Sequence, residues 1–201
     1  HYGTDMHRAL YFLAIGYLAI CGMIVIRSAR SRPRASVPQA AVFSGPGNAW
    51  WVQMKASCNA VEVELAQRVR PAPPTLDGQG YSAACWALAG KIDSARAVID
   101  RLPSGDRYRA AGLVFDIAHP IADAGDNRSA GPIMELVIEY WPNHYMALYH
   151  AGMAEFATNK PELARKNLRA FLTYYHENDG WTSSARETLA FRVDKLVQGA
   201  S

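Results

Sequence analysis

One motif occurs three times in this 201-residue chain, at nearly equal intervals, and it constrains the fold more than any other feature. The copies are AGKIDSARAVIDRLP (89–103), AGDNRSAGPIMELVI (124–138) and TNKPELARKNLRAFL (158–172). Each has a small residue or Asn that is typical of a turn, then a short polar run, then an apolar helical pattern. The repetition predicts a structural unit that is present in three copies.

Alignment of the copies on Ala95, Ala130 and Ala164 gives two intervals that differ by a single position. Twelve positions before each of these alanines lies a small residue, namely Ala83, Ala118 and Gly152. Four positions after each lies an apolar residue, namely Ile99, Met134 and Leu168. A second apolar residue lies seven positions after each, namely Leu102, Val137 and Phe171. Small residues at a fixed offset allow two helices to cross closely, and one hairpin leaves part of its apolar face for the next copy to cover. We therefore expect stacked helical hairpins, with an ordinary helical bundle of accidental spacing as the alternative.

This pattern resembles the tetratricopeptide repeat (TPR) family, whose repeat length of about 34 residues is close to both intervals. The resemblance covers about 76–178 and rests on the paired small residues and on Pro142 after the second repeat. The chain departs from the family pattern in two respects. No Trp lies near the start of a first helix, and the position that usually holds a large aromatic residue is occupied by Trp86, Ile121 and Glu155 in the three copies. The resemblance implies an all-α fold, a TPR-like helical-hairpin solenoid of about three repeats plus capping helices.

The segment before the repeats is expected to cap one end of the solenoid. Residues 48–70 are predicted to form one helix that starts at Asn48 and ends before Pro71, and the first helix with its connection spans 48–75. One apolar stripe supports this helix, formed by Trp51, Met54, Cys58, Val61 and Leu65.

At the other end, residues 179–201 are expected to contain the closing helix, over 182–197, in which Ser184 and Glu187 have capping-box spacing. Within the repeats, Pro120 is expected to kink or shorten a long helix over 106–124.

The N-terminal part has the composition of a membrane anchor. After a tail (1–8), residues 9–26 contain no charged side chain, and 18 helical residues span roughly 27 Å, close to the hydrocarbon thickness of a bilayer. We interpret 9–26 as one transmembrane helix rather than a cleaved signal peptide or a core helix. Small residues that would let another helix pack closely are Gly16, Ala19 and Gly22.

A basic linker rich in Pro and Gly follows at 27–47. It holds four arginines that are expected to contact anionic lipid headgroups, namely Arg27, Arg30, Arg32 and Arg34. Only Arg8 precedes the span, so the positive-inside rule predicts a single-pass protein whose C-terminal domain is cytoplasmic. The periplasmic or lumenal side stays open as the alternative.

Charge and motifs exclude several classes of function. The chain has 21 basic and 18 acidic residues, and the basic excess comes from the arginines of the tail and linker, so nucleic acid is not expected as a partner. No nucleotide-binding, hydrolase or haem motif is present. The histidines lack metal-binding spacing and are interpreted as surface or groove side chains, namely His119, His144, His150 and His176. We therefore expect no catalytic residue, metal or cofactor, and no enzyme.

Cys58 and Cys85 both fall on apolar helical faces. The first interpretation is a pair of buried free thiols. The alternative is a disulfide that ties the first helix to the first repeat, which requires an oxidising compartment.

A protein-binding surface is the remaining expectation. In a solenoid of this kind the first helix of each hairpin lines the concave face, and Met and aromatic side chains there make an adaptable groove. The groove candidates, each with a core position as the alternative, are Phe115, His119, Met146, Tyr149, Met153 and Phe156. Further anchor candidates are Trp50, Trp141 and Trp181.

These features predict a non-catalytic structural or scaffolding subunit of a larger integral membrane complex, for example a photosynthetic or respiratory one. Its partners would be the other protein subunits and the bilayer. The alternative is a membrane-tethered TPR adaptor or assembly factor that binds client peptides transiently.

Overall fold

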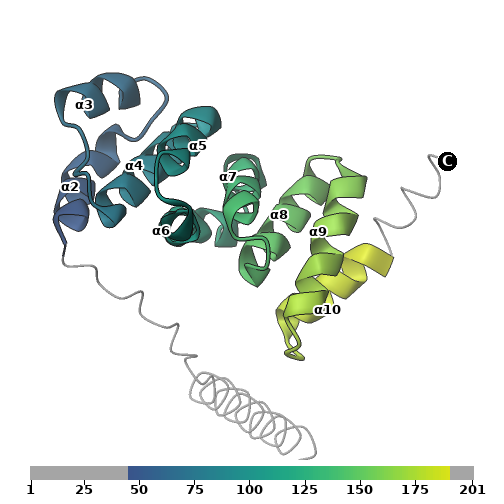
Figure 1. Ribbon diagram of the computed structural model, residues 1–201. Coiled ribbons are helices and arrows are strands. Elements are labelled where there is room, and N and C mark those ends of the chain that lie inside the picture. The colour runs from purple at the N-terminus through teal and green to yellow at the C-terminus, as the bar shows by residue number, and fades with distance from the viewer. Residues whose placement is uncertain (1–44, 191–201) are drawn as a thin grey trace, which may run out of the picture. The chain divides into compact units, whose positions relative to one another are not determined.

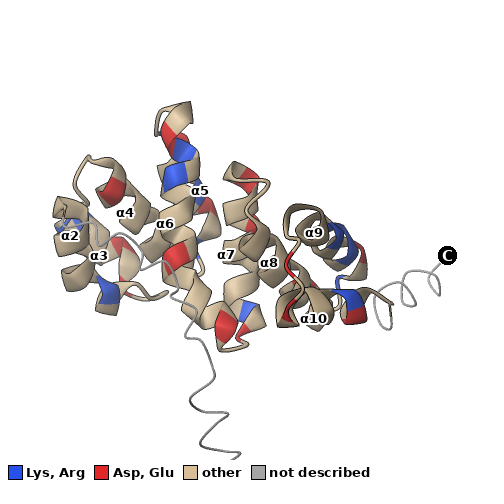
Figure 2. Ribbon diagram, turned by 90° about the horizontal axis from the view of Figure 1, so that it is seen from below, with Lys and Arg blue, Asp and Glu red and all other residues tan. Residues whose placement is uncertain are grey.

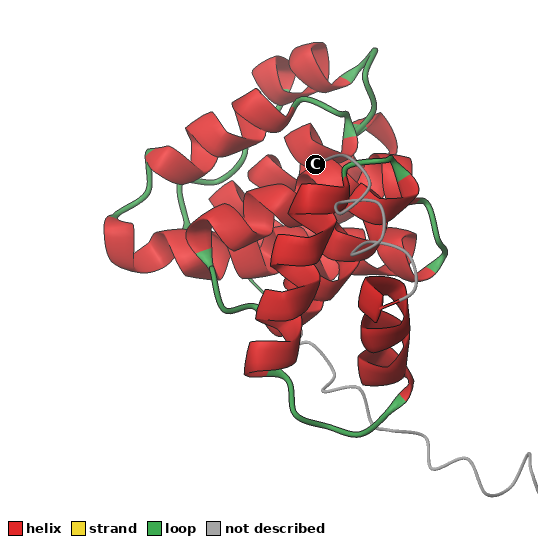
Figure 3. Ribbon diagram, turned by 90° about the vertical axis from the view of Figure 1, so that its right-hand side faces the viewer, coloured by secondary structure: helices red, strands yellow, loops and turns green. Residues whose placement is uncertain are grey.

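The computed structural model describes residues 45–190, and their regular structure is helical throughout (Figure 3), which confirms the all-α class. The α-helices are α2 (Pro46–Met54), α3 (Val63–Val69), α4 (Leu76–Leu88), α5 (Ile92–Asp100), α6 (Ser104–Asp123), α7 (Asn127–Tyr140), α8 (Tyr145–Ala157), α9 (Pro161–Tyr174) and α10 (Gly180–Thr188). None of these described helices is both long and apolar enough to cross a bilayer. The predicted span over 9–26, its small residues and the four linker arginines lie outside the described residues.

Six of the helices form three antiparallel pairs, α4 with α5, α6 with α7 and α8 with α9, which follow one another in chain order (Figure 1). Successive pairs are in contact, because α4 also packs on α6 and α7 also packs on α8. Each pair covers apolar surface that its neighbour would otherwise expose to water.

The three turns inside these pairs have the same backbone geometry. Gly90, Gly125 and Asn159 have φ values of +73°, +81° and +60°, a left-handed conformation that Gly and Asn adopt most readily. In each turn the next residue donates its N–H to the carbonyl five positions earlier, at 2.9, 3.2 and 2.7 Å for the pairs Lys91–Trp86, Asp126–Ile121 and Lys160–Glu155. This Schellman pattern ends the first helix and reverses the chain. The local signal of the repeated motif therefore produces the same turn three times.

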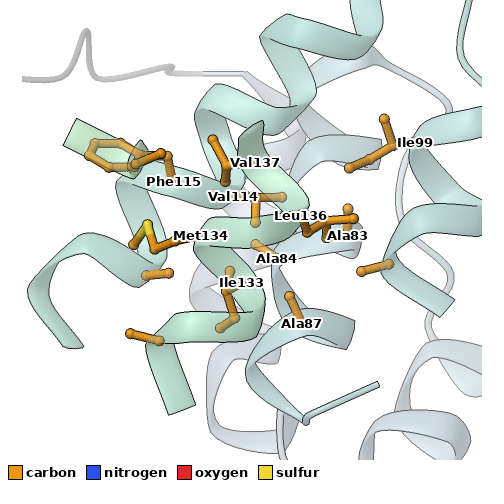
Figure 4. Packing of buried hydrophobic residues seen from close by; sticks show 14 of the residues in the cluster. Ala83, Ala84, Ala87, Ile99, Val114, Phe115, Ile133, Met134, Leu136 and Val137 are labelled. Carbon is orange, nitrogen blue, oxygen red and sulfur yellow. The ribbon is translucent and has the colours of Figure 1, made fainter. Parts of the chain in front are cut away.

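The small residues of the motif lie in the core. The three aligned alanines and the alanines of the earlier small position have exposed fractions of 2% or less, and Gly152 is buried too. Figure 4 shows Ala83, Ala84 and Ala87 of α4 close to the larger side chains of Val114, Ile133 and Leu136. At Gly152 an added Cβ would lie 2.7 Å from Cγ of Leu168, so α8 and α9 approach each other too closely for a side chain there.

The prediction of a single helix over 48–70 is wrong. The chain forms α2 and a 3₁₀ turn (Lys55–Ser57), reverses near Asn59, and resumes as α3. The Asn59 side-chain oxygen accepts from the N–H groups of Val61 and Glu62 at 3.1 and 3.0 Å, which stabilises the turn. The stripe is broken at this point, because Val61 is 90% exposed whereas Val63 is fully buried.

Three other boundaries differ from expectation. The linker ends at Gly45, since Pro46 occupies the first turn of α2, where a missing N–H costs nothing. The closing helix begins at Gly180, because the Asp179 side chain accepts from the N–H groups of Trp181 and Thr182, so Ser184 lies inside the helix. Pro120 does not shorten α6, which continues to Asp123.

Replacing Ala130 with Leu is expected to lower the free energy of unfolding by about 1–3 kcal/mol, because the larger side chain would overpack a core position that is 2% exposed. Ala60→Leu is the matched control: Ala60 lies one repeat length before Ala95 but is exposed in the turn between α2 and α3, so its effect should be small. Thermal melts of the two variants test this, and equal melting temperatures would contradict it.

Candidate interaction surface and histidine cluster

The six predicted groove residues are packed more deeply than an open groove requires. Phe115 and Tyr149 are buried, with exposed fractions of 7% and 8%. The other four are half-buried, namely His119, Met146, Met153 and Phe156. All six are therefore at least partly covered by neighbouring parts of the fold.

The three predicted Trp anchors have different environments. Trp50 is buried in a core cluster, and its Nε1–H donates to the backbone oxygen of Arg70 at 2.9 Å, so it serves the fold. Trp141 and Trp181 are half-buried. These two remain the accessible indole rings among the candidates.

Aromatic and imidazole rings from α6, α8, α10 and the α7–α8 connection form a continuous row. We call it the aromatic–histidine cluster, and it consists of Phe115, His119, Trp141, His144, Tyr149, His150 and Trp181. Ring centroids are 4.1 Å apart for Phe115 and His144, 5.0 Å for His119 and His150, and 4.9 Å for Tyr149 and Trp181. Each such ring contact stabilises the fold by roughly 0.5–1.5 kcal/mol beyond the contribution of the buried surface area. The row therefore stabilises the packing of adjacent hairpins.

At the centre of this cluster, three polar side chains converge. The Nε2 atom of His119 on α6 lies 3.4 Å from Oδ1 of Asp123, one turn further along the same helix. Nε2 of His150 on α8 lies 3.5 Å from the same oxygen. Within residues 45–190, both Nε2 atoms are buried and have no hydrogen-bond partner. Two nitrogens and one carboxylate oxygen thus point to one place.

Burial keeps two rings of the cluster neutral. It lowers the pKa of His150 to about 4, and it likewise lowers the pKa of His144 to about 4. His144 also caps α8, because its Nδ1 accepts from the N–H of Ala147 at 3.2 Å. A lone pair on that nitrogen requires the neutral ring.

A separate open hollow of about 600 Å³ lies beside the cluster and is bordered by α2, α4, α6 and Trp141. Its apolar wall includes Leu76 and Leu113, and Trp141 packs edge-on against Tyr108 at 5.7 Å. The wall also carries Asp116, for which no hydrogen bond or ion pair is found among residues 45–190. The hollow combines an apolar wall with an edge that carries Asp77 and Asp116 together with Arg109, which pairs with Asp106 at 3.4 Å.

Basic and acidic residues both occur along the described helices, as Figure 2 shows. Several of these residues pair across helices, such as Arg96 with Glu139 at 2.9 Å.

The expectation of free thiols at Cys58 and Cys85 is wrong, because the two residues form a disulfide. The bond joins the turn after α2 to the buried face of α4. The disulfide was the alternative interpretation, and it is the one that the structure shows, because α2 packs on α4 and so places Cys58 beside Cys85.

The spacing between the histidines does not by itself predict the convergence of His119, Asp123 and His150. The available signal was His119-x-x-x-Asp123, which places both side chains on one helical face. His150 follows His119 at an interval close to the repeat length, and so falls on the first helix of the next hairpin. Repeat length and helix periodicity together would have suggested the convergence.

No family model matches the chain, and comparison with curated proteins and with solved structures finds no match either.

Proposed function

We propose that this chain is a non-catalytic scaffolding subunit of a membrane complex, and that its helical part is a TPR-like solenoid that holds other subunits. The observation that carries the proposal is the repetition of one hairpin with one turn geometry at Gly90, Gly125 and Asn159. Stacked hairpins of this kind present extended surfaces suited to polypeptide partners.

The hollow beside Trp141 is the surface that we assign to a partner. Its apolar floor would take an aliphatic or aromatic side chain, and Asp116 at its edge would pair with a Lys or Arg of the same segment. A partner segment that carries an apolar residue next to a basic one fits this surface best.

Two features indicate on which side of the membrane the helical domain lies, and they favour different sides. The arginines after residue 26 favour a cytoplasmic domain, whereas the Cys58–Cys85 disulfide favours an oxidising compartment such as a periplasm or lumen. We favour the oxidising side, because arginine placement is a bias with frequent exceptions, while structural disulfides are rare where thiols are kept reduced.

Purification from native membranes in mild detergent tests the scaffolding role. We expect the chain to remain with other proteins at fixed stoichiometry. Asp116→Lys should weaken this association, whereas Glu177→Lys, on an exposed loop outside the hollow, should not. A lone 22.1 kDa chain in its detergent micelle would contradict the proposal. Partners that are displaced by added peptide would favour the adaptor instead.

A further inference from the structure

We propose that His119, Asp123 and His150 bind one divalent transition-metal ion, with Zn²⁺ as the best-fitting candidate, and that the ion joins α6 of the second hairpin to α8 of the third. This inference is independent of the scaffolding role.

The distances suit tetrahedral coordination. Zn²⁺ binds imidazole nitrogen at about 2.0–2.1 Å and carboxylate oxygen at about 2.0–2.2 Å, so tetrahedral ligand atoms lie about 3.3–3.4 Å apart. The two observed separations between Nε2 and Oδ1 are 3.4 and 3.5 Å. All three ligand atoms lie within 4.8 Å of one another. The wider separation must close when the ion binds, and His119, whose side chain is 28% exposed, has more room to adjust than His150 at 6%.

A second observation points to a ligand at this place. The His150 side chain is only 6% exposed, and its Nε2 has no hydrogen-bond partner among the described residues, although a carboxylate oxygen lies 3.5 Å away. Nε2 of His119 is likewise buried without a hydrogen-bond partner among the described residues. Buried polar atoms are nearly always paired, because an unpaired one loses its hydrogen bonds to water without replacement. One metal ion would satisfy both nitrogens at once.

Neighbouring aromatic rings position the two histidines, and the exposed side of the site lets a metal ion enter from solvent. The His119 ring stacks on Phe115 at 4.6 Å, and the His150 ring lies edge-on to Trp181 at 5.6 Å, so both rings are held by aromatic neighbours. The Asp123 side chain is 46% exposed and gives solvent access. Two imidazoles and one carboxylate leave a fourth position for water or for a side chain of a bound partner.

Titration of the metal-free full chain with Zn²⁺, and with Co²⁺ as a spectroscopic probe, tests the site. We expect one equivalent to bind and to raise the melting temperature, and Co²⁺ to show the intense visible absorption of tetrahedral coordination. Asp123→Asn keeps the side-chain shape and should weaken binding more than about tenfold, as should His119→Ala. His176→Ala removes an exposed histidine outside the cluster and should leave binding unchanged.

The variants distinguish this site from other metal-binding groups, such as His1 and His7. Loss of one equivalent in Asp123→Asn with a circular dichroism spectrum like that of the wild type would support the proposal. Absence of saturable binding, or equal binding by wild type, Asp123→Asn and His119→Ala, would overturn it.

Discussion

Replacing both Cys58 and Cys85 with Ser is expected to lower the free energy of unfolding by about 3–4 kcal/mol. The disulfide joins residues 27 positions apart, and closing a loop of this length removes roughly that amount of chain entropy from the unfolded state. Cys85 is fully buried and Cys58 is 8% exposed, so the serine hydroxyls would also be poorly hydrated. For a domain of this size the melting temperature should fall by about 10 °C.

The measurement is a thermal melt with and without reductant. Reductant should lower the wild-type melting temperature to that of the double variant, which should itself be insensitive to reductant. Cys21→Ser removes the third cysteine, which lies outside the described residues, and should behave as wild type.

The same experiment bears on the compartment. If protein from native membranes, unfolded without reductant, reacts with maleimide at all three cysteines, the disulfide is absent there and the cytoplasmic placement is favoured. If only one cysteine reacts, the domain belongs on the oxidising side.

The parts of the fold that the sequence predicts well are those set by local chemistry. Gly90, Gly125 and Asn159 end their helices through their own backbone preferences, and the small residues at fixed offsets identify the close helix crossings. These signals lie within one hairpin, so one sequence suffices to detect them.

The parts that the sequence did not predict depend on contacts between distant segments. The apolar stripe over 48–70 suits one helix, but the bond to Cys85 and the turn at Asn59 favour a reversal there. The convergence of His119 and His150 likewise depends on how two hairpins are rotated relative to each other. Neither effect follows from the periodicity of a single helix.

Glu155 on α8 presents a local conflict that pH should reveal. It occupies the position where the resemblance predicts a large aromatic residue, yet it is a carboxyl that is only 2% exposed. Asn167 on α9 donates to both carboxylate oxygens at 2.8 and 2.9 Å. Burial nevertheless raises the pKa of Glu155 to about 7, from 4.5, because the charged form is poorly solvated and one amide compensates only in part.

The Glu155→Gln variant is therefore expected to be more stable than wild type at pH 8, by up to about 3 kcal/mol, and similar to it near pH 4.5. A carboxyl whose pKa is raised by folding stabilises the fold fully below pH 4.5 and loses that contribution as pH rises to about 7, whereas the amide never ionises. Acid effects from His144 and His150 are common to both proteins and cancel in the difference. Urea unfolding from pH 4.5 to 8 measures it, with Glu187→Gln, exposed on α10, as the control. If the difference in unfolding free energy between the two proteins is the same at every pH, folding does not raise the pKa of Glu155. The hydrogen bonds from Asn167 would then solvate the carboxylate fully, and the prediction would be wrong.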